Sequence, residues 1–272
     1  MSDVILAVLA TPERAHVVLD AAEQVRVLKP GSCIHALGVV ERVSLHALEA
    51  EVLISEAEAV VAREEELAER RAALKSEFAI WAKAAGDAGV GAQWLKFDGT
   101  AKTALAEKGS RADVIIAEQP TDADPFSRVL FRAALFGTDR PVLMVPATGM
   151  VAPLGRKVAT AWREEKQTAR VVIPALRYLG AAEIHILMGV RDPTVSPSLP
   201  MMFREHGVAA RLHPLPIKPG PFGQRLLAKV HELGADLLVM GAYVHSPLRN
   251  LVLGGVTNFM LDNADIPVLM RH

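Results

Sequence analysis

The sequence has little of the residues and charges that mark several large classes of protein. Its single cysteine, Cys33, allows neither a disulfide nor a cysteine-based metal site within the chain, which suits a reducing compartment. The formal charge of −1 lacks the basic excess of a nucleic-acid surface. The longest apolar stretch, residues 171–190, is interrupted by Arg177, Glu183 and His185, whereas a bilayer span needs about 20 mostly apolar residues. No basic leader opens the chain. We therefore expect a cytoplasmic protein that binds neither nucleic acid nor membrane.

Two pairs of similar strings reveal an internal repeat. ADVIIAEQP at 112–120 is similar to ADLLVMGAY at 235–243, and RPVLMVPA at 140–147 is similar to IPVLMRH at 266–272. Similar strings in the same order in both halves predict a tandem duplication.

A segment rich in glycine and proline separates the two copies. Its sequence, TGMVAPLG at 148–155, is typical of a linker. The sequence therefore predicts one domain at 1–148 and a second at 155–272.

Short β-branched runs alternate with helical patterns in both halves. DVIIA at 113–117 and DLLVM at 236–240 lack polar alternation, as parallel strands covered on both faces do. The alternation predicts an α/β fold with two tandem doubly wound domains, each a mostly parallel five-stranded sheet flanked by helices. The strands are expected near 4–9, 33–40, 92–97, 113–117, 141–145, 157–162, 183–190, 208–215, 236–240 and 267–271.

Residues 44–86 depart from the repeat. The absence of glycine and proline between 39 and 85 predicts one long helix or two nearly continuous ones, up to roughly 60 Å long. An apolar residue recurs every seventh position, at Leu53, Val60, Leu67, Leu74 and Trp81. We interpret this element as a helix lying on its own sheet with a solvated charged face. The alternative is a helix that docks a protein partner.

The loop GAYVHSPLRNLVLGGVT at 241–257 is the strongest candidate for a ligand site. Gly254 and Gly255 let the backbone approach a ligand closely, because neither carries a Cβ. Residues 256–261 read as the start of a helix, whose free N–H groups and positive dipole end attract an anion. Thr257 adds a hydroxyl. The alternative is a glycine turn that only delivers the chain to its last helix.

Neither a catalytic group nor a metal site is expected. His245 and Ser246 are adjacent, so they rarely reach one point, and no third acid orients them. His206 and His213 lack the spacing of metal ligands. Arg163 and Lys166 are expected near the mouth of the ligand site, where they could attract an anion.

Strings in the second half resemble the universal stress proteins. DLLVMGAYVHSPLRNLVLGGVTNFML at 236–261, followed by IPVLMRH, is similar to the C-terminal signature of this family in its tandem two-domain form. AWREEKQTARVVIPALRYL at 161–179 and FREHGV at 203–208 support the resemblance. It implies a Rossmann-like fold of the adenine nucleotide alpha hydrolase-like type. It also implies pairing of the domains through their last strands, as an internal pseudo-dimer or in a homodimer.

The same resemblance implies binding of ATP or AMP in the second half. The family's binding pattern is Gly, two residues, Gly, nine residues, Gly and then Ser or Thr. Here Gly241 and Gly254 fill the first and third places, while Val244 and Gly255 depart from the second and fourth. After the half's first strand the binders carry Asp, whereas this chain has Trp162-Arg163-Glu164. The residues implied to hold the nucleotide are Gly241, His245, Gly254, Gly255, Val256 and Thr257.

The first half lacks this pattern. Aligning the repeats places Glu118 opposite Gly241, and a carboxylate there would repel a phosphate. Asp122 and Asp124 add to the repulsion. We expect the first half to be a structural partner without a nucleotide site.

Three functions remain open from the sequence. The first is a non-catalytic regulatory or binding module of the stress response, with nucleotide optional and no metal required. The second is a weak ATPase at the second-half loop. The third is an adaptor that uses the helix at 44–86 and self-association, with neither half binding nucleotide.

Overall fold

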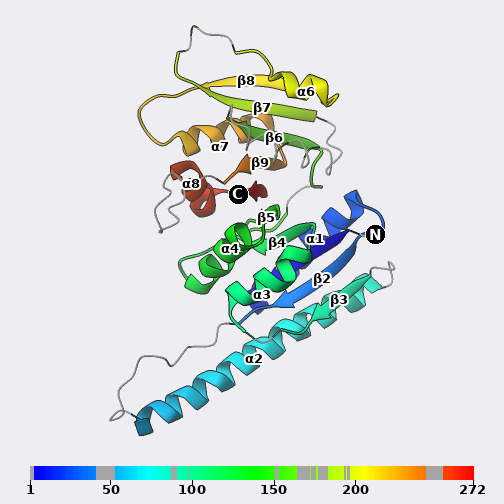
Figure 1. Cartoon of the computed structure of the whole chain (residues 1–272), viewed down its shortest axis with the longest axis vertical. Coiled ribbons are helices and arrows are strands. Elements are labelled where there is room, and N and C mark those ends of the chain that lie inside the picture. The colour runs from blue at the N-terminus through cyan, green and yellow to red at the C-terminus, as the bar shows by residue number, and fades with distance from the viewer. Residues whose placement is uncertain are drawn as a thin grey trace.

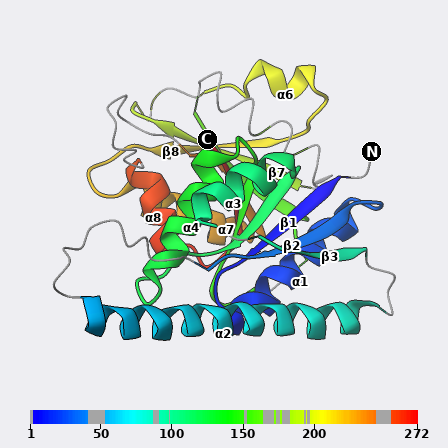
Figure 2. The same ribbon diagram turned by 60° about the horizontal axis from the view of Figure 1, so that its bottom comes forward.

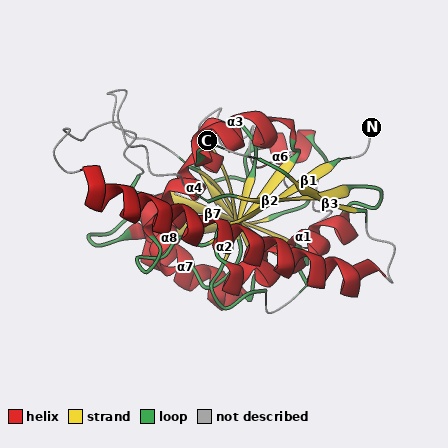
Figure 3. Ribbon diagram, turned by 90° about the horizontal axis from the view of Figure 1, so that it is seen from below, coloured by secondary structure: helices red, strands yellow, loops and turns green. Residues whose placement is uncertain are grey.

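Ten strands form one twisted sheet with helices on both of its faces (Figures 1 and 3). Every neighbouring pair of strands is parallel except β5 and β10, which pair antiparallel at the centre. The computed structural model describes residues 3–40, 53–86, 91–97, 99–150, 153–163, 172, 176, 183–192, 194, 197–242 and 254–272, with side chains of the helix at 53–86 described from residue 61 onward.

Each half contributes strands in the same spatial order. The order across the whole sheet is β3-β2-β1-β4-β5-β10-β9-β6-β7-β8. The strands of the first half are β1 (Val4–Leu9), β2 (Cys33–Gly38), β3 (Ala92–Leu95), β4 (Val114–Glu118) and β5 (Val142–Val145). Those of the second are β6 (Lys157–Trp162), β7 (Glu183–Val190), β8 (Arg211–Pro216), β9 (Leu237–Gly241) and β10 (Val268–Arg271). The predicted doubly wound α/β fold is confirmed.

The helices connect these strands by parallel crossovers. In the first half they are α1 (Pro12–Leu28), α2 (Leu53–Gly86), α3 (Ala101–Lys108), the 3-10 turn η1 (Gly109–Arg111) and α4 (Pro125–Gly137). In the second they are α6 (Met201–Glu205), α7 (Phe222–Leu233) and α8 (Gly255–Asn263). Proline at the first helical position starts both α1 and α4, where its fixed φ suits the helix and its missing N–H is not needed.

The core lies in two layers, one on each face of the sheet. On one face the sheet packs against α1, α2 and α6, with Leu19, Leu74 and Phe203 fully buried. On the other face it packs against α3, α4, α7 and α8, with Leu105, Phe131 and Met260 among the buried residues. Because both faces are covered, the central strands β1, β4, β5, β9 and β10 are mainly apolar.

The last strands of the two halves meet at the centre of the sheet. Leu269 of β10 lies opposite Leu143 of β5. Side chains beside this junction add ion pairs between the halves, from Arg271 to Asp139 at 3.2 Å and from Arg128 to Asp262 at 2.8 Å. The pairing makes one continuous sheet of the two halves.

Helix α2 is the longest element and runs along one side of the molecule (Figure 2). It packs mainly against α1 and more lightly against β2 and β3. Leu67 and Leu74 of the predicted heptad series are buried, and the half-buried Trp81 donates its indole N–H to Asp20 at 3.0 Å. Residues 44–52 of the predicted helix lie outside the described residues. Within the described ranges no helix is both long and apolar enough to cross a membrane.

Candidate functional site

A cavity of 470 Å³ opens at the carboxyl ends of β6, β7 and β9. In doubly wound sheets this edge is where ligands bind. The residues that line it are Ala161, Trp162, Arg163, Leu187, Met188, Gly189, Arg191, Ile217, Phe222, Leu226, Met240, Gly241, Gly254, Gly255, Val256 and Thr257.

The structure brings together five of the six residues that the sequence predicts for a nucleotide site. Gly241 ends β9, and Gly254 is the N-cap of α8. Gly255 and Val256 open that helix, and Thr257 follows, 3% exposed. All five line the cavity. The sixth, His245, lies outside the described residues, as do Val244 and Glu164.

The amino end of α8 gives the cavity an electropositive wall. Its first helical hydrogen bond runs from the Asn258 N–H to the Gly254 carbonyl, so the N–H groups before it have no partner within the helix. Gly254 has no side chain to cap this end, and the first turn of the helix carries no acid. Such an end favours a bound anion.

Two arginines add positive charge at the mouth. Arg163 follows β6 and Arg191 follows β7, and both line the cavity. Arg163 thus lies at the cavity, where the sequence places it, and Lys166 lies outside the described residues. The sequence analysis did not identify Arg191 as a site residue. Its position directly after an apolar strand is the signal that could have placed it at the same edge of the sheet as Arg163.

Most of the other residues that line the cavity are apolar. Leu187 and Met188 come from β7, Met240 from β9, and Ile217 and Phe222 from the segment that leads into α7. The described lining residues include two guanidinium groups and one hydroxyl but no carboxylate, histidine or cysteine. These residues can hold an anion that carries a flat apolar group.

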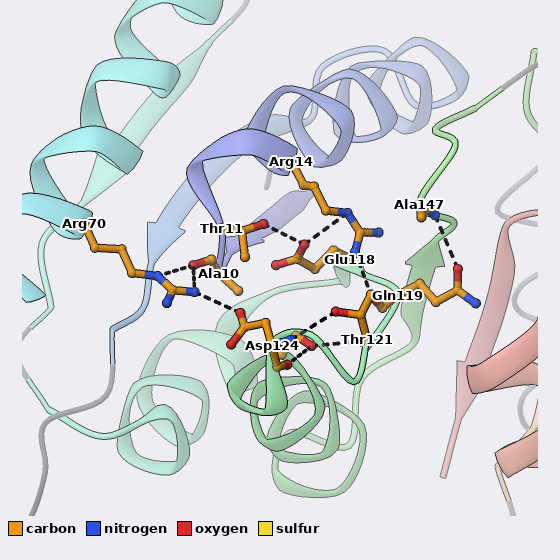
Figure 4. Close-up of polar contacts among 10 residues, drawn as sticks. Ala10, Thr11, Arg14, Arg70, Glu118, Gln119, Thr121, Asp124 and Ala147 are labelled. Atoms are coloured by element: carbon orange, nitrogen blue, oxygen red, sulfur yellow. Dashed lines mark hydrogen bonds and ion pairs between the residues drawn. The ribbon is translucent and has the colours of Figure 1, made fainter.

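The equivalent edge of the first half carries a network of polar side chains beside a second cavity of 440 Å³, which Thr11, Arg70 and Asp124 help to line. Glu118 ends β4 as Gly241 ends β9, and it is only 4% exposed. The Thr11 hydroxyl donates to its carboxylate at 2.9 Å, and Arg14 lies 3.3 Å from the same oxygen (Figure 4). Burial raises the pKa of Glu118, and the attraction of Arg14 opposes that rise.

Arg70 of α2 closes this network from outside. Its guanidinium donates to the Ala10 carbonyl at 3.0 and 2.8 Å and to the Asp124 carboxylate at 2.9 Å (Figure 4). Asp124 also accepts from the Phe126 N–H as the N-cap of α4. The sequence interpretation placed the charges of α2 on a solvated face, which is wrong for Arg70, because its side chain is 31% exposed and joins α2 to the ends of β1 and α4. Only the tertiary structure places a carbonyl and a carboxylate beside it.

No group of three or more His, Cys, Asp or Glu residues in the described part of the chain is arranged to hold a metal ion.

The segment that matches a known protein family contains elements that build the cavity. Residues 217–272 match the universal stress protein family. The matched segment contains α7, β9, α8 and β10, and so it includes Gly241 and Gly254–Thr257. No curated protein matches the chain.

Solved structures share the whole fold of this chain at low identity. A universal stress protein from Archaeoglobus fulgidus DSM 4304 aligns with 17% identity and a TM-score of 0.64, over 100% of this chain and 98% of that one. A protein from Pseudomonas aeruginosa UCBPP-PA14, provisionally described as a universal stress protein, aligns with 16% identity and a TM-score of 0.60, over 99% and 93%. The cytoplasmic domain of a prokaryotic cation chloride cotransporter reaches 12% identity and 0.53, over 99% and 94%. Such likenesses establish the architecture, which proteins of different function share.

Proposed function

We propose that this chain is a universal stress protein that acts as a non-catalytic binding module of the stress response, and that its second half holds an adenine nucleotide such as ATP or AMP. The observation that carries the proposal is the cavity that the amino end of α8 lines together with apolar side chains. The helix end and the arginines suit a phosphate, and the apolar side chains suit a flat base.

The first half serves as the structural partner in this proposal. Glu118 stands where a phosphate would have to approach, and Arg14 and Thr11 fill the space around its carboxylate. Ligand binding is therefore proposed for one half of the chain.

Isothermal titration of the full chain with ATP and AMP tests the proposal. Arg191→Ala removes one guanidinium at the mouth, and we expect it to weaken nucleotide binding about tenfold. Arg111→Ala, an exposed arginine of the first half, is the matched control and should bind as the wild type does. Absence of binding by the wild-type chain, or equal loss in both variants, would rule the nucleotide site out.

Measurement of phosphate release from ATP distinguishes a weak ATPase from a binding module. Release that persists in Arg111→Ala and disappears in Gly254→Val would mean that the cavity hydrolyses the nucleotide it binds. Bound nucleotide recovered intact after long incubation supports the non-catalytic role.

An adaptor role has one observation in its favour. Val61 and Ile80 of α2 are 58% and 62% exposed, although both are large and apolar. If α2 mediates association with a second copy, light scattering should detect an oligomer that Val61→Glu combined with Ile80→Glu converts to a monomer. An unchanged mass in that variant would exclude this role for the two residues.

A further inference from the structure

Two histidines of the second half meet across neighbouring strands. His185 of β7 and His213 of β8 lie with Nδ1 of the first 2.8 Å from Nε2 of the second. Their rings are tilted by 42° with centroids 5.0 Å apart. His185 is 3% exposed, and His213 is half-buried. The pair lies near the amino ends of its strands, whereas the cavity lies at the carboxyl ends.

A carboxylate determines which nitrogen of His185 carries a proton. Nε2 of His185 lies 3.0 Å from Glu183. Burial raises the pKa of Glu183, but Lys157, His185 and Arg211 outweigh it and hold the pKa below its ordinary value. The ionised carboxylate can only accept a hydrogen bond, so Nε2 of His185 must be the donor.

The short distance between the rings then limits the pair to one added proton. With both imidazoles neutral, His213 donates from Nε2 to the bare Nδ1 of His185. After one proton is added, the bond survives, because one of the two facing nitrogens still lacks a hydrogen. After a second, both facing nitrogens carry hydrogens, and two N–H groups cannot share a 2.8 Å contact.

The charges around the pair come from four elements. Glu183 on β7, Lys157 on β6 and Arg211 on β8 form one ion cluster, with Lys157 and Arg211 at 3.5 and 3.1 Å from Glu183. On α7, Lys229 and Glu232 pair with each other at 2.6 Å, and the charges of both act on His213. Burial lowers the pKa of His213 most, followed by the charge of His185, then Lys229. A second positive charge is therefore disfavoured.

The strand that carries His213 is at the edge of the sheet. The Ile217 N–H donates to the Val190 carbonyl, so by alternation the positions of Pro214 and Pro216 face away from β7. Proline at these two positions removes two of the N–H donors that the outer edge would offer to another strand. Release of β8 would expose β7, which has no proline, as a new edge.

We propose that His185 and His213 form an acid-sensitive clasp that holds edge strand β8 on the sheet at neutral pH and loosens it when both rings are protonated. The exposed edge of β7 is then available for pairing with a second copy of the chain. This role is independent of the proposed nucleotide site, since the clasp is at the other end of the strands.

The direction of the pH effect follows from the pKa of His213. Because this pKa is lower in the folded chain than the ordinary value of about 6.5, the unfolded chain takes up the proton first as the pH falls. The contribution to stability is complete above about pH 6.5 and is lost as the pH falls through the folded-state pKa.

Thermal unfolding of His213→Gln and the wild-type chain, at about pH 7.5 and pH 5, tests the clasp. Glutamine keeps a donor for Nδ1 of His185 but does not titrate. We expect the fall in Tm between the two pH values to be smaller in the variant, by about 2–4 °C. His16→Gln, which replaces an exposed histidine of α1, should fall as the wild type does. An equal fall in all three chains would overturn the proposal.

Side-chain NMR of the wild-type chain provides a test that needs no variant. A coupled pair takes up its protons in two separate steps that both rings report. We expect this behaviour together with a loss of hydrogen-exchange protection at the Ile217 amide in the second step. Independent single-step titration of the two rings, or full protection of that amide at about pH 5, would show that no clasp exists.

Discussion

The Gln119 side chain of the first half donates from Nε2 to the Leu261 carbonyl of the second half at 3.0 Å. Its other amide atom, Oε1, accepts from the Ala147 N–H at 3.3 Å (Figure 4). Leu261 lies in the last turn of α8, where carbonyls have no partner within the helix. Gln119 thus caps, from the first half, the helix whose other end lines the cavity.

Gln119→Leu should destabilise the chain. It leaves a buried carbonyl and an N–H without partners, for a loss of about 1–3 kcal/mol in the free energy of unfolding. Urea denaturation measures the loss. Gln93→Leu, at an exposed position of β3, is the control and should change stability by less than about 0.5 kcal/mol. Equal effects of both changes would contradict the capping role of Gln119.

Arg70→Ala should separate α2 from the ends of β1 and α4. The hydrogen bonds of its guanidinium to Ala10 and Asp124 involve charged groups, so we expect a loss of about 1.5–3 kcal/mol. Arg63→Ala in the same helix breaks an exposed ion pair with Glu66 and should cost about 0–1 kcal/mol. Denaturant unfolding followed by circular dichroism compares the two variants. A larger loss of stability in Arg63→Ala would show that the contacts of Arg70 do not hold α2 in place.

Gly255→Ser should strengthen nucleotide binding if the proposed site is correct. A Cβ at Gly255 would meet no atom within 4 Å, and its φ is not in the left-handed region, so serine fits without strain. Its hydroxyl restores the donor that the family pattern places there. One added hydrogen bond predicts an affinity about fivefold higher by calorimetry. Gly255→Ala adds the Cβ without the hydroxyl, and a gain of the same size in that variant would show that the hydroxyl is irrelevant.

Gly223→Ala should disturb the packing of α7 on α8. A Cβ at Gly223 would lie 2.7 Å from the ring of Phe259. Although alanine favours a helix, the overlap should cost about 1–3 kcal/mol. Gly137→Ala at the end of α4 meets no atom within 4 Å and should be neutral or stabilising. Thermal unfolding of the two variants checks whether the changes in stability have opposite signs. A stabilising effect of Gly223→Ala would show that Gly223 does not pack closely against Phe259.

Glu118 should make the chain more stable as the pH is lowered. Its folded-state pKa lies above the ordinary value of about 4.3, so its favourable contribution is complete below that pH and is lost as the pH rises through the folded pKa. Glu118→Gln cannot ionise and removes this component. The stability of the wild type relative to the variant should therefore rise from about pH 7 to pH 5 in urea titrations. A difference that stays constant or falls would show that Glu118 has no raised pKa.

The sequence by itself determined the elements and their order. Apolar runs such as 113–117 and 236–240 predict buried parallel strands, because a strand covered on both faces needs apolar side chains at every position. The predicted strands correspond to the observed ones, and glycine at 241 and 254 indicates the cavity edge. These features are local, so a short stretch of sequence is enough to reveal them.

Only the tertiary structure decided which distant side chains meet. Arg70 and Asp124 are 54 residues apart, Gln119 and Leu261 are 142 apart, and His185 and His213 are 28 apart. No periodicity in the sequence links these residues, since their contacts depend on strand order, on the register between strands and on how each helix lies across the sheet. A charged or polar residue in the sequence has many possible partners, and the packing of the whole chain selects one.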